Sequence, residues 1–343
     1  MSTVKLRSGR VIGDYLAPYF IAELNTSHFG DIGIARSMID QAKEAGCDCV
    51  KFQSWSSESL YADSYYKQNA ITKRIVTKFS LDNSELKQLA DYCSEVGIDF
   101  ASTPYSRAEA DFLARDCNVP FIKIASMELN NLPYLAYLAT LDVPLVLSTG
   151  MGTLDEIITA VRTIETAGNT DIIILHCTSV YPAPPEAIRL NNILGLRAEF
   201  PAYPIGYSDH SMGSEIPAAS IALGACVIEK HFTLDSSRIG MDNQMATEPE
   251  DMKRMIDACN TVHRALGGAG RILDETERAQ IPKMRRSIVT AKALPAGHML
   301  TSYDLDAKRP GIGLAPDKVD LLIGRRLKKS VDQGDVLSVD DVE

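Results

Sequence analysis

The fold is decided by residues 98–148, IDFASTPYSRAEADFLARDCNVPFIKIASMELNNLPYLAYLATLDVPLVLS. Three short apolar runs occupy residues 98–102, 121–125 and 144–148, and each has the length of a buried strand. Two longer segments of helical period separate these runs and begin near Arg107 and Asn131. Short apolar runs that alternate with amphipathic helices are typical of βα units arranged around a parallel sheet.

The same alternation extends on both sides of this stretch, from Tyr19 to Leu266. We predict eight strands at Phe20–Leu24, Cys49–Gln53, Ile98–Ser102, Phe121–Ala125, Pro144–Ser148, Ile172–His176, Pro204–Ser208 and Cys226–Lys230. The intervening helices are expected to begin near Asp31, Ser84, Arg107, Asn131, Thr153, Pro185, Ser214 and Thr247. Eight βα units within about 265 residues match a (β/α)8 barrel, whereas an open doubly wound sheet usually has fewer strands. The sequence therefore predicts an α/β fold of the TIM-barrel class.

The helical pattern ends after Leu266, where Gly267-Gly-Ala-Gly270 is a strong stop signal. We expect a barrel domain at residues 1–266, a linker at 267–285 and a small domain at 286–343. The small domain repeats one pattern, Gly-x-x-Leu-Thr/Ser-x-x-Asp, which starts at Gly297 and again at Gly334. Two copies of one turn-and-strand unit predict a pseudo-symmetric β domain, and the alternative is a chance recurrence of common turn residues.

Composition excludes several classes of function. The 343 residues include 45 acidic and 35 basic side chains, and this net charge of −10 disfavours non-specific binding to nucleic acid or anionic membrane. No apolar run approaches the ~18–20 residues of a membrane span, and the start MSTVKLRSGR lacks the apolar stretch of a secretion signal. The seven cysteines lack metal-binding spacing and read as reduced thiols. We therefore expect a cytoplasmic protein.

Two lysines belong to predicted strands of the barrel, whose active site is expected where the strands end. Side chains alternate along a strand, so Lys51 should share the inner face with Gln53. Lys123 lies on another predicted strand of the barrel. A lysine in the barrel interior is costly unless a group of opposite charge lies beside it. One interpretation pairs the lysines with a structural carboxylate such as Glu23. The other is an anion site for phosphate and carboxylate, completed by hydroxyl groups at strand ends: Thr103, Ser126, Ser148 and Ser208.

Two histidines follow what should be neighbouring strands and could bind one metal ion between them. These are His210 and His231, and the alternative for each is a hydrogen-bonded core histidine. Two protein ligands leave positions for water or substrate, which favours a catalytic ion over a structural one. Of the remaining histidines, we expect His28 to contact the substrate and His263 and His298 to lie on the surface. His176 could belong either to the core or to the site.

In this order, the strand-end motifs resemble those of the sialic acid synthase family of nonulosonic acid synthases. Members of that family condense phosphoenolpyruvate with an N-acylated amino sugar. The motifs are Ala22-Glu23, His28-x-Gly-Asp31, Lys51-Phe-Gln53, Ser102-Thr-Pro104, Lys123-Ile-Ala-Ser126, Ser148-Thr-Gly-Met151, Cys177-Thr-Ser-x-Tyr-Pro182, Gly206-Tyr-Ser-Asp-His210 and Glu229-Lys-His-Phe-Thr233. The tail is similar to the antifreeze-like (SAF) domain of that family, with Lys308-Arg309-Pro-Gly-x-Gly313 where that domain delivers an arginine to the sugar.

The resemblance implies a role for each matching residue. The phosphoenolpyruvate-binding set would be Lys51, Thr103, Lys123, Ser126, Ser148, Ser179 and Ser208. The acceptor-sugar set would be Gln53, Asn69, Tyr181, Asp242 and Arg309, and the catalytic set Glu23, Glu128, Tyr181 and Asp242. Glu128 is the first candidate for proton handling and Glu23 the second. His210 and His231 would bind a divalent ion, Mn²⁺ first with Mg²⁺ or Co²⁺ as alternatives. The resemblance also implies a domain-swapped homodimer in which Arg309 acts on the partner's barrel.

The sequence departs from the family pattern at positions that the resemblance places near the acceptor sugar. It has Ser27-His-Phe-Gly-Asp31 for the usual Asn-His-Asn-Gly-Asp, Ser179 for an asparagine, and Gly240-Met-Asp-Asn243 for Gly-Pro-Asp-His. The expected acceptor is therefore N-acetylmannosamine or a 2,4-diacetamido-trideoxyhexose. Two rival functions remain: another metal-dependent aldolase or phosphoenolpyruvate-using synthase, and a non-catalytic sugar- or ice-binding protein.

Overall fold

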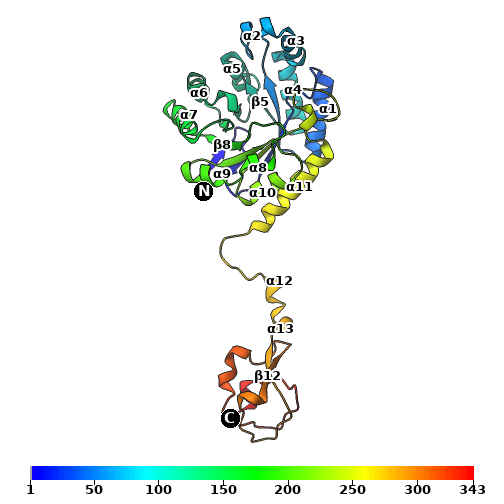
Figure 1. Ribbon diagram of the computed structural model, residues 1–343, viewed down its shortest axis with the longest axis vertical. Coiled ribbons are helices and arrows are strands. Elements are labelled where there is room, and N and C mark those ends of the chain that lie inside the picture. The colour runs from blue at the N-terminus through cyan, green and yellow to red at the C-terminus, as the bar shows by residue number, and fades with distance from the viewer. Residues whose placement is uncertain (1) are drawn as a thin grey trace. The chain divides into compact units, whose positions relative to one another are not determined.

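A parallel sheet of eight strands forms the centre of the first of two compact units, Met1–Gly267 and Gly268–Glu343. The computed structural model describes residues 2–343 (Figure 1). The eight strands are β3 (Tyr19–Glu23), β4 (Cys49–Ser54), β5 (Asp99–Pro104), β6 (Ile122–Ile124), β7 (Leu145–Ser148), β8 (Ile172–Cys177), β9 (Ile205–Asp209) and β10 (Val227–His231). Their hydrogen-bonded order is β5-β4-β3-β10-β9-β8-β7-β6, and the end strands β5 and β6 contact each other. The predicted barrel is confirmed, with each strand end within two residues of its expected position.

Helices surround the strands (Figure 1). They are α1 (Ile32–Ala45), α4 (Asn83–Val96), α5 (Arg107–Arg115), α6 (Leu132–Ala139), α7 (Leu154–Thr166), α8 (Pro185–Ile188), α9 (Asn192–Glu199), α10 (Glu215–Ala222) and α11 (Pro249–Leu266). Two 3-10 turns, η1 (Ser126–Glu128) and η2 (Asn243–Met245), follow β6 and β10. Two further helices, α2 (Asp63–Gln68) and α3 (Ala70–Phe79), lie between β4 and α4 and were not predicted.

Strand alternation divides the apolar residues into two cores. Val50 and Phe52 of β4 face outward and pack with helix residues such as Met38 and Leu86. The inner core contains Ile21, Ala101, Val146, Leu175 and other inward-facing strand residues. Lys51 and Gln53 therefore face the barrel interior, as the sequence predicted.

A short hairpin closes the N-terminal end of the barrel. Strands β1 (Thr3–Lys5) and β2 (Val11–Gly13) pair antiparallel and were not predicted. Their residues Val4 and Ile12, with Leu6 between them, are buried in the inner core. Apolar side chains thus fill this end of the barrel, and space for a ligand remains at the opposite end.

One glycine and one ion pair show how tightly the strands are packed around β9. A Cβ atom at Gly206 would lie 2.6 Å from Leu175 Cδ2 and 2.9 Å from Val227 Cβ. On the outward faces of β9 and β10, the buried Asp209 forms an ion pair with the buried Lys230. Lys230 is thus a structural lysine, in contrast to Lys51 and Lys123.

The second unit begins with the segment expected to be a linker. That segment contains two short helices, α12 (Glu275–Arg278) and α13 (Ile281–Met284). Strands β11 (Ser287–Thr290) and β12 (Leu305–Lys308) follow and pair antiparallel. The buried side chains of this unit's own core are Ile288, Leu294, Leu300, Leu322, Leu327, Val331, Leu337 and Val342.

The internal repeat has a structural counterpart in this unit. The 3-10 turns η3 (Ser302–Asp304) and η5 (Val339–Asp341) each begin with a reciprocal capping box, and η4 (Pro316–Leu321) lies between them. Lys292 Nζ lies 2.9 Å from Asp304 Oδ1, and Lys329 Nζ lies 3.0 Å from Asp341 Oδ1. Corresponding positions of the two copies thus adopt the same local structure. In residues 2–343, no helix combines the length and hydropathy needed to cross a membrane.

Candidate active site

A cavity of about 360 Å³ opens at the C-terminal ends of the barrel strands. Its walls combine the inner faces of the strands with residues from the loops that follow them. The strand residues and their immediate successors that line it are Glu23, Asn25, Lys51, Gln53, Thr103, Tyr105, Lys123, Ser126, Ser148, Cys177, Ser179, Ser208, His210, Glu229 and His231. Most predicted site residues are therefore brought together in one place.

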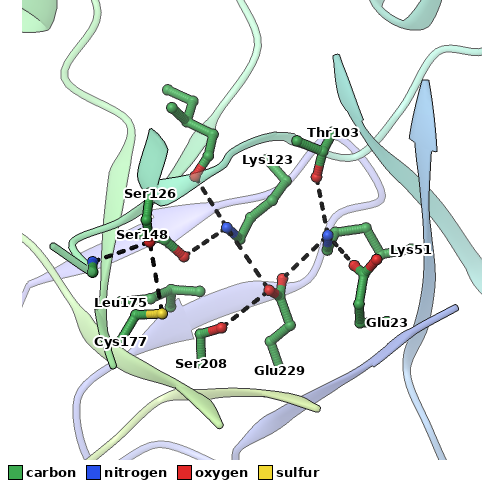
Figure 2. A network of polar contacts seen from close by, with 12 residues as sticks. Glu23, Lys51, Thr103, Lys123, Ser126, Ser148, Leu175, Cys177, Ser208 and Glu229 are labelled. Atoms are coloured by element: carbon green, nitrogen blue, oxygen red, sulfur yellow. Dashed lines mark hydrogen bonds and ion pairs between the residues drawn. The ribbon is translucent and has the colours of Figure 1, made fainter. Parts of the chain in front are cut away.

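Two buried lysines lie on either side of one buried carboxylate (Figure 2). Glu229 Oε2 is 3.9 Å from Lys51 Nζ, and its Oε1 is 3.8 Å from Lys123 Nζ. Lys51 also forms an ion pair with Glu23 and donates to Thr103 Oγ1 at 3.0 Å. Lys123 donates to Ser148 Oγ at 2.6 Å, and Ser208 Oγ donates to Glu229 Oε1 at 3.2 Å. We call Lys51, Lys123, Glu229 and these hydroxyl groups the lysine cage.

Burial and charge pairing oppose each other in the lysine cage. Burial lowers the pKa of Lys123, and Glu229 only partly offsets this. Burial also disfavours charge on Lys51, but Glu229 and Glu23 outweigh it and raise the pKa of that lysine. For Glu229, the two lysines outweigh burial and lower its pKa, whereas burial raises the pKa of Glu23. The lysines thus have carboxylate partners, as one sequence-based interpretation expected, and they also face the cavity, where the anion site of the other interpretation stays a prediction.

Backbone and hydroxyl groups extend the lysine cage toward β7 and β8. Gly150 N–H donates to Ser126 Oγ at 3.0 Å, and Ser126 Oγ donates to Cys177 Sγ at 3.6 Å. A Cβ atom at Gly150 would lie 2.3 Å from Ser179 Oγ, so this close approach requires glycine. These small polar groups suit the oxygens of a phosphate or carboxylate.

The two histidines at the ends of β9 and β10 have ring centroids 5.4 Å apart. His210 Nδ1 lies 2.8 Å from the carbonyl oxygen of Thr178, which suits a tautomer with a lone pair on Nε2. Burial lowers the pKa of His231 well below its usual range, which favours the neutral form that metals bind. Within residues 2–343, no three His, Cys, Asp or Glu side chains gather to hold an ion. A metal ion held by this pair would have only two protein ligands and would keep its other coordination positions open.

A second polar group lies at the ends of β3, β4 and β5. Tyr105 OH donates to Gln53 Oε1 at 3.2 Å, and Gln53 Nε2 donates to Glu23 Oε1 at 3.0 Å. Asn25 Nδ2 donates to Asp242 Oδ2 at 2.6 Å and so joins the loop after β10 to this group. Tyr181 lies beside the histidines, with its ring centroid 4.2 Å from that of His210. Glu23, Gln53, Tyr181 and Asp242 thus line one cavity with the lysine cage.

Three predicted site residues do not line the cavity. Glu128 lies in η1, where the turn directs its carboxylate to Asn131, whose Nδ2 donates to Oε2 at 2.7 Å. Asn69 lies between α2 and α3, and its Nδ2 donates to the carbonyl oxygen of Tyr65 at 3.1 Å. Arg309 is an exposed residue of the second unit. Glu128, the first candidate for proton handling, therefore lies in the turn after β6 and not among the residues that line the cavity.

Two of the other predicted histidines are core residues. His28 is buried against Phe52, and its Nδ1 accepts a hydrogen bond from Gly30 N–H at 3.1 Å. It does not line the cavity, so the expected substrate contact is not present. His176 stacks on Tyr207, and its Nε2 lies 2.6 Å from the carbonyl oxygen of Ile188.

Several side chains that line the cavity were not predicted from the sequence as site residues. Glu229 precedes His231 by two positions on one strand, so period-two alternation alone would have placed both on the inner face. Trp55 and Tyr105 lie in the loops after β4 and β5, where strand alternation gives no signal. Their rings pack with centroids 5.7 Å apart.

Family models match both units of the chain. The model of the NeuB family matches residues 38–271, and the model of the SAF domain matches residues 285–343. The chain belongs to the NeuB family. The predicted resemblance and the expected C-terminal SAF region are thereby confirmed.

Individual NeuB-family relatives match nearly the whole chain. N,N'-diacetyllegionaminic acid synthase of Legionella pneumophila is 33% identical over 355 residues, covering 100% of this chain and 99% of the relative. N-acetylneuraminate-9-phosphate synthase of Mus musculus is also 33% identical, over 99% of this chain and 97% of its own. Among solved structures, the N-acetylneuraminic acid synthetase of Leptospira borgpetersenii in complex with citrate matches with a TM-score of 0.74 and 29% identity. That match covers 82% of this chain and 96% of the other.

Proposed function

We propose that this NeuB-family chain is a nonulosonic acid synthase that joins phosphoenolpyruvate to an N-acylated amino hexose with uptake of water and release of phosphate. The acceptor would be N-acetylmannosamine or a 2,4-diacetamido-trideoxyhexose. The observation that carries the proposal is the lysine cage, in which two buried lysines face a cavity that also contains the second polar group at the ends of β3, β4 and β5.

The lysine cage would bind phosphoenolpyruvate by its phosphate and its carboxylate. Lys51 and Lys123 supply charge, and Thr103, Ser126, Ser148, Ser179 and Ser208 supply hydrogen bonds to the oxygens. Glu229 holds the two ammonium groups in place before the ligand arrives. Preorganised donors of this kind stabilise charge without rearranging during the reaction.

In the proposed reaction, C3 of phosphoenolpyruvate forms a bond to the aldehyde carbon of the open-chain sugar. The aldehyde oxygen takes up a proton and becomes a hydroxyl group. The oxygen of water bonds to C2, and C2 becomes the ketone carbon when its bond to the phosphate oxygen breaks and phosphate leaves. Glu23, through Oε2, would accept the proton released by the attacking water, and Gln53 and the Asn25 backbone N–H hold its Oε1. Asp242 and Tyr181 would orient the acceptor beside Glu23. Alignment of the two reactants can contribute up to ~7–11 kcal/mol toward the barrier.

His210 and His231 would hold a divalent ion, with Mn²⁺ as first choice and Mg²⁺ or Co²⁺ as alternatives. The chemistry that such an ion supplies when bound is Lewis-acid polarisation of a carbonyl oxygen. Thr178 fixes the ring of His210 through its carbonyl oxygen, a contact that orients metal-binding histidines.

Treatment with EDTA followed by added Mn²⁺ tests the ion. We expect activity to be lost and then restored, and His210→Ala to be inactive under all metal conditions. Full activity after exhaustive EDTA treatment would remove the ion from the mechanism.

We also propose a domain-swapped homodimer in which Arg309 contacts the acceptor sugar bound by the partner subunit. This rests on membership of the NeuB family and on the exposed position of Arg309 in the SAF region. A cytoplasmic location follows from the proposed substrate, since phosphoenolpyruvate is a cytoplasmic metabolite.

The direct test incubates the purified protein with phosphoenolpyruvate, Mn²⁺ and a panel of 2-acetamido and 2,4-diacetamido hexoses. We expect stoichiometric release of phosphate and formation of a nonulosonic acid with at least one sugar. An aldolase would form a product without phosphate release, and a non-catalytic sugar-binding protein would bind sugar but not phosphoenolpyruvate. The absence of phosphate release with every sugar would refute the proposed function.

A further inference from the structure

One aromatic ring outside the cavity joins two of the segments near its rim. Phe29, in the loop after β3, packs edge-to-face on Phe79 at the end of α3, with ring centroids 5.7 Å apart at 88°. The guanidinium of Arg238 also lies over the Phe29 ring, with Cζ 3.8 Å from the ring centroid. Arg238 belongs to the loop between β10 and η2, whereas Phe29 does not line the cavity. Phe29 therefore connects the loop after β10 to α3.

The loop after β10 is closed from inside by one buried side chain. Asn243 Nδ2 donates to the carbonyl oxygens of Asp235 and Arg238, each at 2.8 Å. Its Oδ1 accepts a hydrogen bond from Thr233 Oγ1 at 2.6 Å. Asp242, the residue before Asn243, lines the cavity. Because Asn243 ties Arg238 to the residues around Asp242, a contact that holds Arg238 also helps to hold Asp242.

The loops after β3 and β10 meet at two places. Asn25 Nδ2 donates to Asp242 Oδ2 at 2.6 Å, and the Phe29 ring contacts Arg238. A Cβ atom at Gly240 would lie 3.2 Å from Phe29 Cε1, so the backbone of the loop passes close to the same ring. Asn25 and Phe29 have positive φ values of 42° and 53°. Side chains other than glycine keep such values where surrounding contacts hold them.

The outer part of the loop after β10 gains little from its own burial. Ile239 is 86% exposed, and its neighbour Arg238 is exposed as well. The base of the loop is held separately, because the Ser236 N–H and Oγ donate to Glu248 Oε1 at 2.9 and 2.8 Å. The Phe29 ring thus supports the part of the loop that leads from this base to the cavity.

We infer that Phe29 is a positioning residue for the acceptor, because it holds Arg238 and so keeps Asp242 in place at the cavity. This role rests on the proposed function, in which Asp242 orients the acceptor. It also accounts for two positions at which the sequence departs from the family pattern, Phe29 and Asn243. Both support one loop, and neither lines the cavity.

The first experiment needs no substrate. The full-length protein is digested briefly with trypsin, and the cleavage sites are identified by mass spectrometry. We expect Phe29→Leu to speed cleavage after Arg238 about 5- to 10-fold, because the arginine is no longer held on the ring. Cleavage after Arg271, an exposed arginine of the second unit, is the internal control and should not change. An unchanged ratio of the two cleavage rates would overturn the inference.

The second experiment measures phosphate release with the sugar that the direct test identifies, and phosphoenolpyruvate binding by calorimetry. We expect Phe29→Leu to lower kcat/KM for the acceptor about 10-fold and to leave the Kd for phosphoenolpyruvate unchanged, because Lys51 and Lys123 lie on β4 and β6. Phe29→Tyr keeps the ring and should retain the wild-type values.

An unchanged kcat/KM for the acceptor in Phe29→Leu would contradict the positioning role and leave the proposed function intact. Equal losses for the acceptor and for phosphoenolpyruvate would also contradict it, since they indicate a general disturbance of the barrel. A wild-type protein that releases no phosphate with any sugar would refute the proposed function and, with it, the role toward the acceptor.

Arg238→Met covers the case in which Phe29→Leu does not fold, because Arg238 is exposed. We expect this variant to raise the acceptor KM about 3- to 5-fold. Arg36→Met is the matched control, since Arg36 Cζ lies 5.2 Å from the centroid of the Tyr92 ring and Arg36 does not line the cavity. The double variant Phe29→Leu/Arg238→Met should be no worse than Phe29→Leu alone. Additive effects, or an equal effect of Arg36→Met, would overturn the inference.

Discussion

Glu229 determines the electrostatics of the cavity at the scale of single residues. It is buried between two lysines, and its Oε2 has no hydrogen-bond partner among the described residues. Removing either lysine therefore does more than delete a contact to an anionic substrate. It leaves a carboxylate with one cation in a buried environment, and phosphoenolpyruvate would then meet repulsion from Glu229.

Substitution of Lys123 tests this view. We expect Lys123→Met to weaken phosphoenolpyruvate binding by about 100-fold, because a charge-assisted contact worth about 3 kcal/mol is lost. Isothermal titration calorimetry with phosphoenolpyruvate alone measures the effect without depending on the acceptor sugar.

Lys230→Met is the matched control for a buried lysine outside the cavity. Lys230 pairs with Asp209 on the outer face of the strands, so this variant should lose roughly 3–5 kcal/mol of stability. Its folded fraction should bind phosphoenolpyruvate normally. Equal loss of binding in both variants would show that Lys123 acts through the fold alone.

His28 gives a pH dependence of stability. Burial lowers its pKa from 6.5 to about 4, so between these values the unfolded chain binds a proton that the folded chain does not. Stability therefore rises with pH across this window, and His28 costs about 3 kcal/mol at pH values below about 4. Urea unfolding of wild type and His28→Asn from pH 7.5 to pH 4 should show a shallower decline in the variant. Parallel curves would contradict the prediction.

At the scale of secondary-structure elements, the close packing of β9 between β8 and β10 makes Gly206 sensitive. We expect Gly206→Ala to lower the free energy of unfolding by about 1–3 kcal/mol, because the new methyl group overlaps Leu175 and Val227. Gly195→Ala in α9 is the control. A Cβ atom there meets nothing within 4 Å, so the variant should be up to about 1 kcal/mol more stable. Urea unfolding distinguishes the two, and equal changes would contradict the packing argument.

The elements of the barrel could be predicted because each strand is a short apolar run and each helix has its own period. The hairpin of β1 and β2 was missed, since strands of three residues are too short to give a comparable signal. Helices α2 and α3 were missed because they are mostly exposed and lie within one long βα connection. Inward-facing residues on strands were placed well, whereas Glu128, in a turn, was not. The strand period gives no information on the direction of a side chain in a turn.

At the scale of the whole molecule, every side chain that lines the cavity belongs to the first unit. The proposed contact of Arg309 with the acceptor is therefore separable from phosphoenolpyruvate binding. We expect Arg309→Ala to raise the acceptor KM by about 10- to 100-fold and to leave the calorimetric Kd for phosphoenolpyruvate unchanged.

The control is Arg325→Ala, because Arg325 is an exposed arginine of the same unit. This variant should change neither the acceptor KM nor the Kd for phosphoenolpyruvate. Sedimentation velocity should show a dimer for all three proteins. A monomer with full activity would contradict the proposed exchange of units between subunits.

The N-terminal hairpin has a kinetic consequence. Because Val4, Leu6 and Ile12 fill the N-terminal end of the barrel, we expect ligands to enter the cavity from the C-terminal ends of the strands. The side chains of the lysine cage are buried in this cavity, whereas Tyr181 and Met241 at its rim are about half exposed. A ligand bound at the rim would block the way to the cage. Phosphoenolpyruvate must then bind before the sugar, and a saturating dead-end sugar analogue should slow its association and also its escape.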